Sequence, residues 1–104
     1  MLTCWPVLTE AAYLLRDKPN EVRQLLANCR QGLLQILPLT VTDVPRMQSI
    51  LDRFSDQHFQ LADVALMHLA EREGFVKVFT LDHRDFSVFW KSDGTNLTMF
   101  PVNT

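Results

Sequence analysis

The spacing of hydrophobic and polar positions predicts helices alternating with short strands along the 104 residues. Leu2–Trp5 is short and apolar and fits the end of a strand. Apolar residues at helical spacing then predict a helix over Pro6–Leu15, with proline at its first position. A second stripe predicts a helix over Glu21–Arg30, with Asn20 as its N-cap and Gly32 just beyond its end.

The middle of the chain continues this alternation. Leu33–Leu39 is a short apolar run that predicts a strand, which its internal proline limits. Thr42 or Asp43 is expected to cap a helix that continues to about Phe54. Leu61–Glu73 predicts a long and very apolar helix, which the glycine at position 74 closes.

The last third predicts a strand over Phe75–Leu81, a turn over Asp82–Asp85 and a final strand near Leu97–Val102. Strands separated by helices indicate an α/β fold with a mostly parallel sheet flanked by helices. Residues 1–104 form a single domain in this interpretation, since no repeat, linker or low-complexity segment divides them.

The composition excludes some functions. Ten basic and 12 acidic residues give a net charge of −2, which provides no general attraction to nucleic acid or to anionic membranes. Cys4 and Cys29 do not have the paired spacing of a zinc site. The N-terminus does not resemble a signal peptide and no apolar run approaches the length of a membrane span, so we expect a cytoplasmic protein without a membrane segment.

Two carboxylates stand out because they fall on apolar elements. Asp63 lies in the first turn of the predicted helix over Leu61–Glu73 and shares a face with Leu66 and Met67. Asp82 directly follows the predicted strand, where ligands bind in open α/β sheets. Each also has an ordinary explanation, helix-dipole complementation for Asp63 and the start of a turn for Asp82.

Glu10 and Asp85 are weaker candidates. Glu10 flanks the apolar stripe of the first predicted helix, where a solvated edge explains it equally well. Asp85 is expected to cap a short helical turn or to assist a metal. If two or three of these carboxylates converge, their oxygens suit Mg²⁺ or Mn²⁺.

Other polar and aromatic residues have ordinary interpretations. The three histidines are expected at the surface, because each has polar neighbours in sequence: His58, His68 and His83. Trp5 and Trp90 are expected to be core or strand residues rather than platforms for nucleobases. Arg84 and Lys91 could hold a phosphate backbone, although solvated surface charges are more common.

The order of these segments resembles the PIN domain, and in particular the VapC-like toxin ribonucleases. Three stretches carry the resemblance: Trp5–Ala11, Ala62–Glu71 and Phe79–Phe86. They are similar to the family segments with the second, third and fourth acids. The resemblance implies a PIN-like three-layer fold and an endoribonuclease that hydrolyses RNA phosphodiesters with Mg²⁺ or Mn²⁺.

The same resemblance implies roles for particular residues and partners. Glu10, Asp63 and Asp82 are the implied catalytic and metal-binding residues, and Asp85 is a further implied metal ligand. An RNA substrate, a cognate antitoxin protein and a second copy of the chain are the implied partners. A catalytically inactive module that binds a protein or self-associates is the alternative function.

The chain departs from the family pattern at its start. The family opens with a central strand ending in an aspartate, and no residue here corresponds to that strand or that first acid. The expectation is therefore a domain incomplete at its N-terminus, with unpaired strand edges. A start upstream of Met1, pairing with a second copy, or a decayed gene product would each explain the departure.

Overall fold

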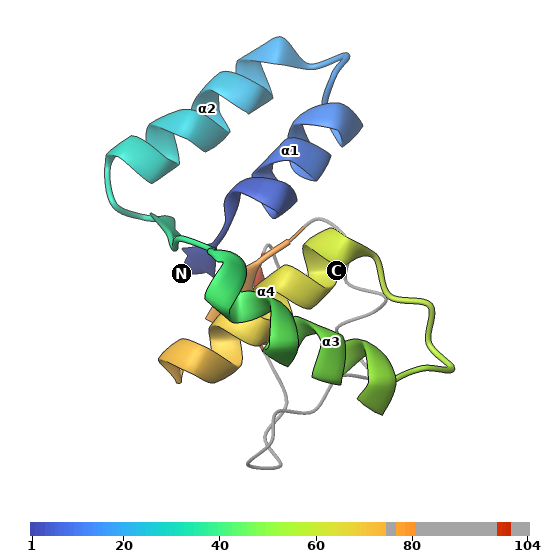
Figure 1. Cartoon of the computed structure of the whole chain (residues 1–104). Helices are drawn as coiled ribbons and strands as arrows, with labels where there is room; N and C mark the ends of the chain where they lie inside the picture. The colour runs from blue at the N-terminus through green and yellow to red at the C-terminus, as the bar shows by residue number, and fades with distance from the viewer. Residues whose placement is uncertain (75–76, 81–97, 101–104) are drawn as a thin grey trace.

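A computed structural model describes residues 1–74, 77–80 and 98–100 of the chain. The elements alternate as the hydrophobic pattern predicts, and their order is β1 (Leu2–Thr3), α1 (Trp5–Leu14), α2 (Pro19–Arg30), β2 (Gln35–Ile36), the 3-10 turn η1 (Val41–Asp43), α3 (Val44–Arg53), α4 (Leu61–Glu73), β3 (Lys77–Phe79) and β4 (Thr98–Phe100). Figure 1 shows α1 and α2 as a helical hairpin that stands apart from α3.

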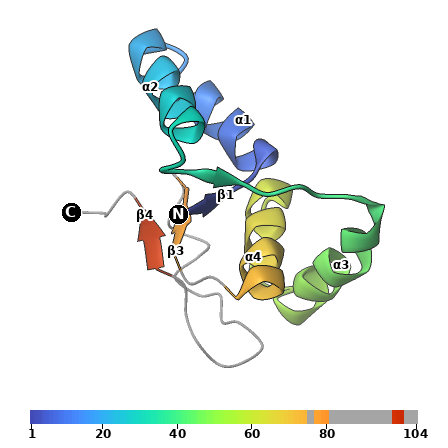
Figure 2. The same ribbon diagram turned by 90° about the vertical axis from the view of Figure 1, so that its left-hand side faces the viewer.

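The four described strands form one parallel sheet in the order β2-β1-β3-β4. Leu2 pairs with Gln35 on one side and with Val78 on the other. The expectation of unpaired edges is therefore wrong for β1, because β2 and β3 lie directly against it (Figure 2). The α/β class with a parallel sheet flanked by helices is confirmed.

Two clusters of buried side chains hold the helices to the sheet. The larger cluster joins β1 and β3 to α3 and α4, with Leu2, Ile50, Leu66 and Val78 fully enclosed. The smaller cluster joins α1 and α2 to the start of β2 and includes Leu8, Ala11, Leu25 and Leu34. Each fully buried Leu, Ile or Val contributes roughly 1.5–3 kcal/mol through removal of apolar surface from water.

Helix α4 is the central element of the larger cluster. All eight residues from Asp63 to Ala70 are buried, so every side of the helix meets protein. Its predicted bounds are confirmed at both ends. Gly74 follows with φ 71°, a left-handed conformation that glycine adopts without steric cost and that ends the helix.

One predicted helix cap is wrong, and a second is confirmed in position only. Asn20 does not cap α2, because Pro19 already occupies the first turn; the Asn20 side chain instead accepts a hydrogen bond from Arg23 at 2.8 Å. Asp43, one of the two expected caps, stands at the N-cap position of α3, but its side chain makes no capping hydrogen bond to that helix. Thr40 caps η1 in a reciprocal capping box with Asp43, and α3 follows without a break.

The predicted strand over Leu33–Leu39 shrinks to Gln35–Ile36, because Leu37 donates its last ladder hydrogen bond to Thr3 and Pro38 has no N–H. Trp5 is helical and 58% exposed rather than a core or strand residue, because it begins α1 at a position that faces away from the sheet. Cys4 and Cys29 are both free thiols.

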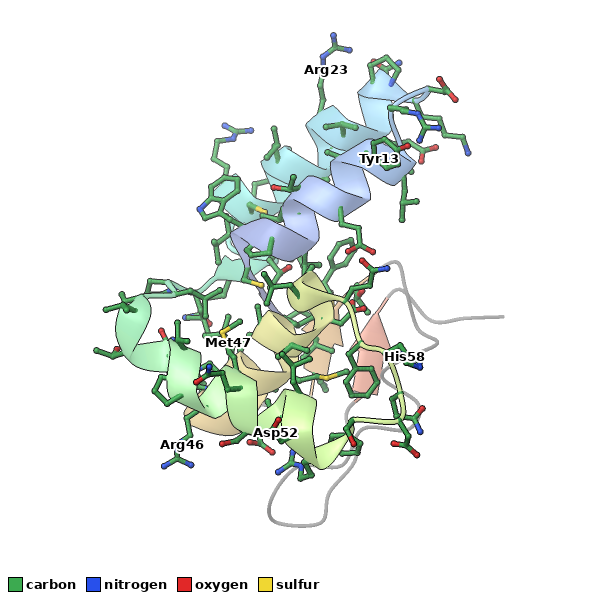
Figure 3. The ribbon with its side chains drawn as sticks, turned by 45° about the vertical axis from the view of Figure 1, so that its right-hand side comes forward. Tyr13, Arg23, Arg46, Met47, Asp52 and His58 are labelled. Carbon is green, nitrogen blue, oxygen red and sulfur yellow. The ribbon has the colours of Figure 1, made fainter. Side chains whose placement is uncertain are left out.

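Figure 3 shows how α3 divides its side chains between the core and solvent. Met47 points from α3 toward α4 and packs against the larger cluster, whereas Arg46 and Asp52 project away from it. In the described part of the chain, no helix is long and apolar enough to cross a membrane.

Candidate functional site

Asp63 is fixed in place by its position in α4. It lies in the first turn of the helix and is only 1% exposed, between the apolar residues that surround α4 on all sides. The prediction that this aspartate lies in an apolar neighbourhood is therefore confirmed. Burial of an ionised carboxylate is costly unless a positive group compensates it, so the surroundings of Asp63 determine what it can do.

Glu10 reaches the same region from α1. The helix buries Val7, Leu8 and Ala11 and leaves Glu10 half-buried at the edge of this apolar face. A half-buried glutamate keeps contact with solvent while its carboxylate stays close to the protein interior. This combination suits a group that must meet a ligand from outside.

Glu10 and Asp63 line one hollow together with Thr80, which directly follows β3. Val7, Ala11 and Leu14 of α1 complete the described walls, and these side chains leave no room between them for a water-sized sphere. A small ion is the kind of ligand that the described walls could accommodate.

The electrostatic character of the hollow is acidic. None of its described lining residues carries a positive charge, and two of them are carboxylic acids. The neighbouring thiol responds to this environment: burial, together with the charge of Asp63, raises the pKa of Cys4 to about 11. Cys4 is therefore an inert, protonated thiol beside the hollow and not a nucleophile.

The donor atoms of the hollow fit a hard divalent cation. Carboxylate oxygens from Glu10 and Asp63 and the hydroxyl of Thr80 are all oxygen donors, which Mg²⁺ and Mn²⁺ prefer. No group of three or more His, Cys, Asp or Glu residues that could hold a metal occurs within residues 1–74, 77–80 and 98–100. The described part of the chain thus supplies two carboxylates toward such a site.

The remaining candidates fall elsewhere in the sequence. Asp82 and Asp85 lie outside the described residues, as do His83, Arg84, Trp90 and Lys91. Thr80, which the sequence interpretation did not select, is buried and lines the hollow two positions before Asp82. Its place at the carboxyl end of a parallel strand is the signal that could have identified it.

Sequence reasoning also missed a second polar cluster on the other side of α4. His68 is only 4% exposed, so its expected surface position is wrong. Its Nε2 lies 2.7 Å from Oδ1 of Asp43, and Nη1 of Arg72 donates to the same oxygen at 3.0 Å. The polar sequence neighbours of His68 misled the prediction, because helical position and not sequence context decides burial.

Asp43 is strongly stabilised as an anion in this cluster. The hydrogen bond with His68 lowers the pKa of Asp43 well below its usual range, and the backbone N–H of Thr40 and the Arg72 guanidinium act in the same direction against the effect of burial. The cluster is a compensated structural anion. His58, by contrast, is exposed as expected.

Comparison with known proteins agrees with the order of these segments. The model of the PIN domain family matches residues 1–89 of the chain. A search of curated proteins finds no match. The family match covers most of the chain, including both described carboxylates of the hollow, and the parallel α/β architecture is consistent with it. The chain therefore belongs to the PIN domain family, whose members are generally nucleases that use divalent metals.

Proposed function

We propose that this protein is a metal-dependent endoribonuclease of the VapC toxin type. The observation that carries the proposal is the meeting of Glu10 and Asp63 in one acidic hollow, although 52 residues separate them in the sequence. Membership of a family of nucleases supports this interpretation. Asp82, which corresponds to the family's fourth acid in this proposal, follows two positions after Thr80 in the sequence.

Each acid has a separate role in the proposal. Asp63 holds the cation from the buried side, since α4 leaves its side chain little freedom. Glu10 holds it from the half-buried mouth, on the side from which RNA approaches. Asp82 completes the catalytic set, and Asp85 is a further ligand. A divalent cation bound by these residues would supply Lewis acidity toward an RNA phosphodiester and would lower the pKa of a bound water molecule.

The proposed setting is the bacterial-type toxin–antitoxin pair, in which a cognate antitoxin protein is the partner and the reaction occurs in the cytoplasm. Two free thiols among the described residues suit a reducing compartment. An RNA substrate with a net negative charge requires local compensation on a chain whose own charge is −2, and the cation supplies it.

The test is cleavage of single-stranded RNA by the purified protein with Mn²⁺ or Mg²⁺, followed on denaturing gels. Asp63→Asn keeps the volume of the buried side chain but removes its charge, and it should abolish cleavage; Asp63→Ala should do the same. Asp52→Asn, an exposed aspartate on α3, is the matched control and should cleave normally. Cleavage by Asp63→Asn at the wild-type rate would refute the proposal.

A second candidate function is a non-catalytic module that binds a protein partner or a second copy of itself. The observation that favours it is an apolar groove of about 240 Å³ between α1 and α2, on the face of α1 opposite to Glu10. Trp5 and Leu26 line it and are 58% and 49% exposed. Exposed apolar surface of this kind often marks an interaction site.

Manganese titration separates the two functions. A metal site raises the melting temperature as Mn²⁺ increases, whereas a binding module shows no such shift. A stand-alone structural protein that depends on self-association predicts a stable oligomer, and dilution to a folded monomer in sedimentation experiments would exclude it.

A further inference from the structure

Helix α4 lacks the feature that usually fixes the rotation of a helix about its own axis. A surface helix turns its apolar stripe inward, and the boundary between apolar and polar faces defines its orientation. In α4 the eight residues from Asp63 to Ala70 are all buried, and apolar side chains occur on every side. Apolar packing alone therefore discriminates weakly between different rotations of this helix.

On the side of α4 opposite to Asp63, His68 and Arg72 make directional contacts with Asp43. His68 Nε2 lies 2.7 Å from Asp43 Oδ1. Arg72 Nη1 donates to Asp43 Oδ1 at 3.0 Å and to the carbonyl oxygen of Pro38 at 3.1 Å. Hydrogen bonds weaken steeply as their angles change, so these three contacts depend on the rotation of α4 in a way that apolar contacts do not.

Asp43 provides a fixed reference for those contacts. Its second carboxylate oxygen, Oδ2, accepts a hydrogen bond from the backbone N–H of Thr40 at 2.8 Å within the capping box of η1. The side chain is 6% exposed and is held from its own segment as well as from α4. An acceptor that cannot swing to follow a moving donor selects one position of that donor.

His68 and Arg72 lie about 140° and 180° around the helix axis from Asp63, at about 100° per residue. The compensated cluster and the acidic hollow are therefore on opposite sides of one rigid element. A rotation of α4 that broke the contacts with Asp43 would also carry Asp63 out of the hollow that it shares with Glu10.

We propose that His68 and Arg72 are positioning residues, which set the rotation of α4 through Asp43 and thereby hold the Asp63 carboxylate opposite Glu10. The consequence for metal binding rests on the proposed function, whereas the consequence for the orientation of α4 does not. The cluster thus acts on the proposed site without touching the metal or the RNA.

The decisive variant is His68→Leu, which keeps an apolar side chain of similar size in the core but loses the hydrogen bond to Asp43. Two readouts are needed. Methyl nuclear Overhauser contacts between α4 and α1 report the rotation of the helix directly. Paramagnetic broadening by Mn²⁺ reports the affinity of the hollow for the cation. His68→Leu should weaken or replace the α4–α1 contacts and lower Mn²⁺ affinity at least tenfold.

His68→Gln and Arg53→Gln are the controls. Glutamine can still donate to Asp43, so His68→Gln should restore both readouts in large part. Arg53→Gln removes the 2.9 Å ion pair between Arg53 of α3 and Glu71 of α4, a surface contact of the same helix, and it should leave both readouts unchanged. If His68 had a purely structural role, His68→Leu would lower the free energy of unfolding without changing the α4–α1 contacts.

The outcomes distinguish this inference from the proposed function. If wild-type protein binds no Mn²⁺, the proposed function fails while the α4–α1 contacts still test the positioning role. Unchanged contacts in folded His68→Leu, with affinity within twofold of wild type where binding occurs, would overturn the inference. If His68→Leu does not fold, the double variant that combines His68→Leu with Asp43→Asn also removes the buried charge of Asp43. The same two readouts are then measured on the double variant.

Discussion

The two sides of α4 treat a buried carboxylate in opposite ways. On one side, Asp43 is surrounded by His68, Arg72 and a backbone N–H, and its charge is compensated by the protein. On the other side, Asp63 faces Glu10 across a hollow whose described walls carry no positive charge. The first arrangement stabilises a fold. The second concentrates negative charge, as a cation site requires.

This contrast explains why burial alone does not identify a functional acid. Both aspartates are at least nine-tenths buried; Asp63 belongs to α4, and Asp43 contacts that helix. What distinguishes them is the sign of their neighbours. Asp43 lies among hydrogen-bond donors, whereas Asp63 shares its hollow with a second carboxylate, and a cation would stabilise two carboxylates held together.

The largest effect on stability is expected on the side of α4 that contacts Asp43. Asp43→Ala removes the acceptor of His68 and Arg72 and opens the capping box with Thr40. The free energy of unfolding should fall by about 3–5 kcal/mol, as for the loss of one partner of a buried pair. Urea denaturation measures it. A loss below about 1 kcal/mol would show that the cluster contributes little to the fold.

For Asp63→Asn the main loss is expected in RNA cleavage and not in stability. Removal of one of the facing carboxylates should lower RNA cleavage by at least about 100-fold, more than the loss of a residue that only supports a ligand. In metal-free buffer the free energy of unfolding should fall by less than in Asp43→Ala, because asparagine keeps the volume of the side chain and removes one buried negative charge. If Asp63→Asn cleaved RNA normally but lost stability, Asp63 would have the structural role that is assigned here to Asp43.

The pH dependence of stability should also differ between the two sides. Because the folded state lowers the pKa of Asp43, this residue contributes stability above its unfolded pKa of about 3.9, and the contribution is lost as the pH falls below that value. Urea melts between pH 2 and 6 should show this decline. Asp43→Asn should flatten it, and an unchanged slope would contradict the role given to the cluster.

The smallest effect is expected at the surface. Arg53→Gln breaks an ion pair with Glu71 whose Arg53 side chain is 38% exposed. Exposed pairs of this kind contribute about 0–1 kcal/mol, so the free energy of unfolding should change by less than about 1 kcal/mol. A larger loss would mean that the contact between α3 and α4 depends on surface charge as well as on Asp43.

The hydrophobic pattern predicted the elements well because it depends on local spacing. The bounds of α4 followed directly from its apolar run and Gly74, and the parallel sheet followed from strands alternating with helices. Caps were harder to predict, because several polar residues compete for each helix start. The side chain that caps the start of η1 is that of Thr40, two positions before Thr42, the first of the two expected caps.

The candidate site could be predicted only in part. Asp63 was recognisable because it interrupts an apolar run, and Glu10 because it flanks one. The Asp43–His68–Arg72 cluster could not be found, since Asp43 lies 25 positions before His68 and 29 before Arg72 and meets them only through tertiary packing. The continuous pairing of β1 with β2 and β3 was likewise invisible, because strand neighbours are set by tertiary contacts.

The central claim is that Glu10 and Asp63 form part of one divalent cation site. Calorimetric titration of metal-free protein with Mn²⁺ tests it most directly, alongside Glu10→Gln, Asp63→Asn and the exposed control Asp52→Asn. The account predicts saturable binding by wild type and by Asp52→Asn, with affinity at least about tenfold lower in each of the other two variants. Equal binding by all four proteins, or none by wild type, would contradict it.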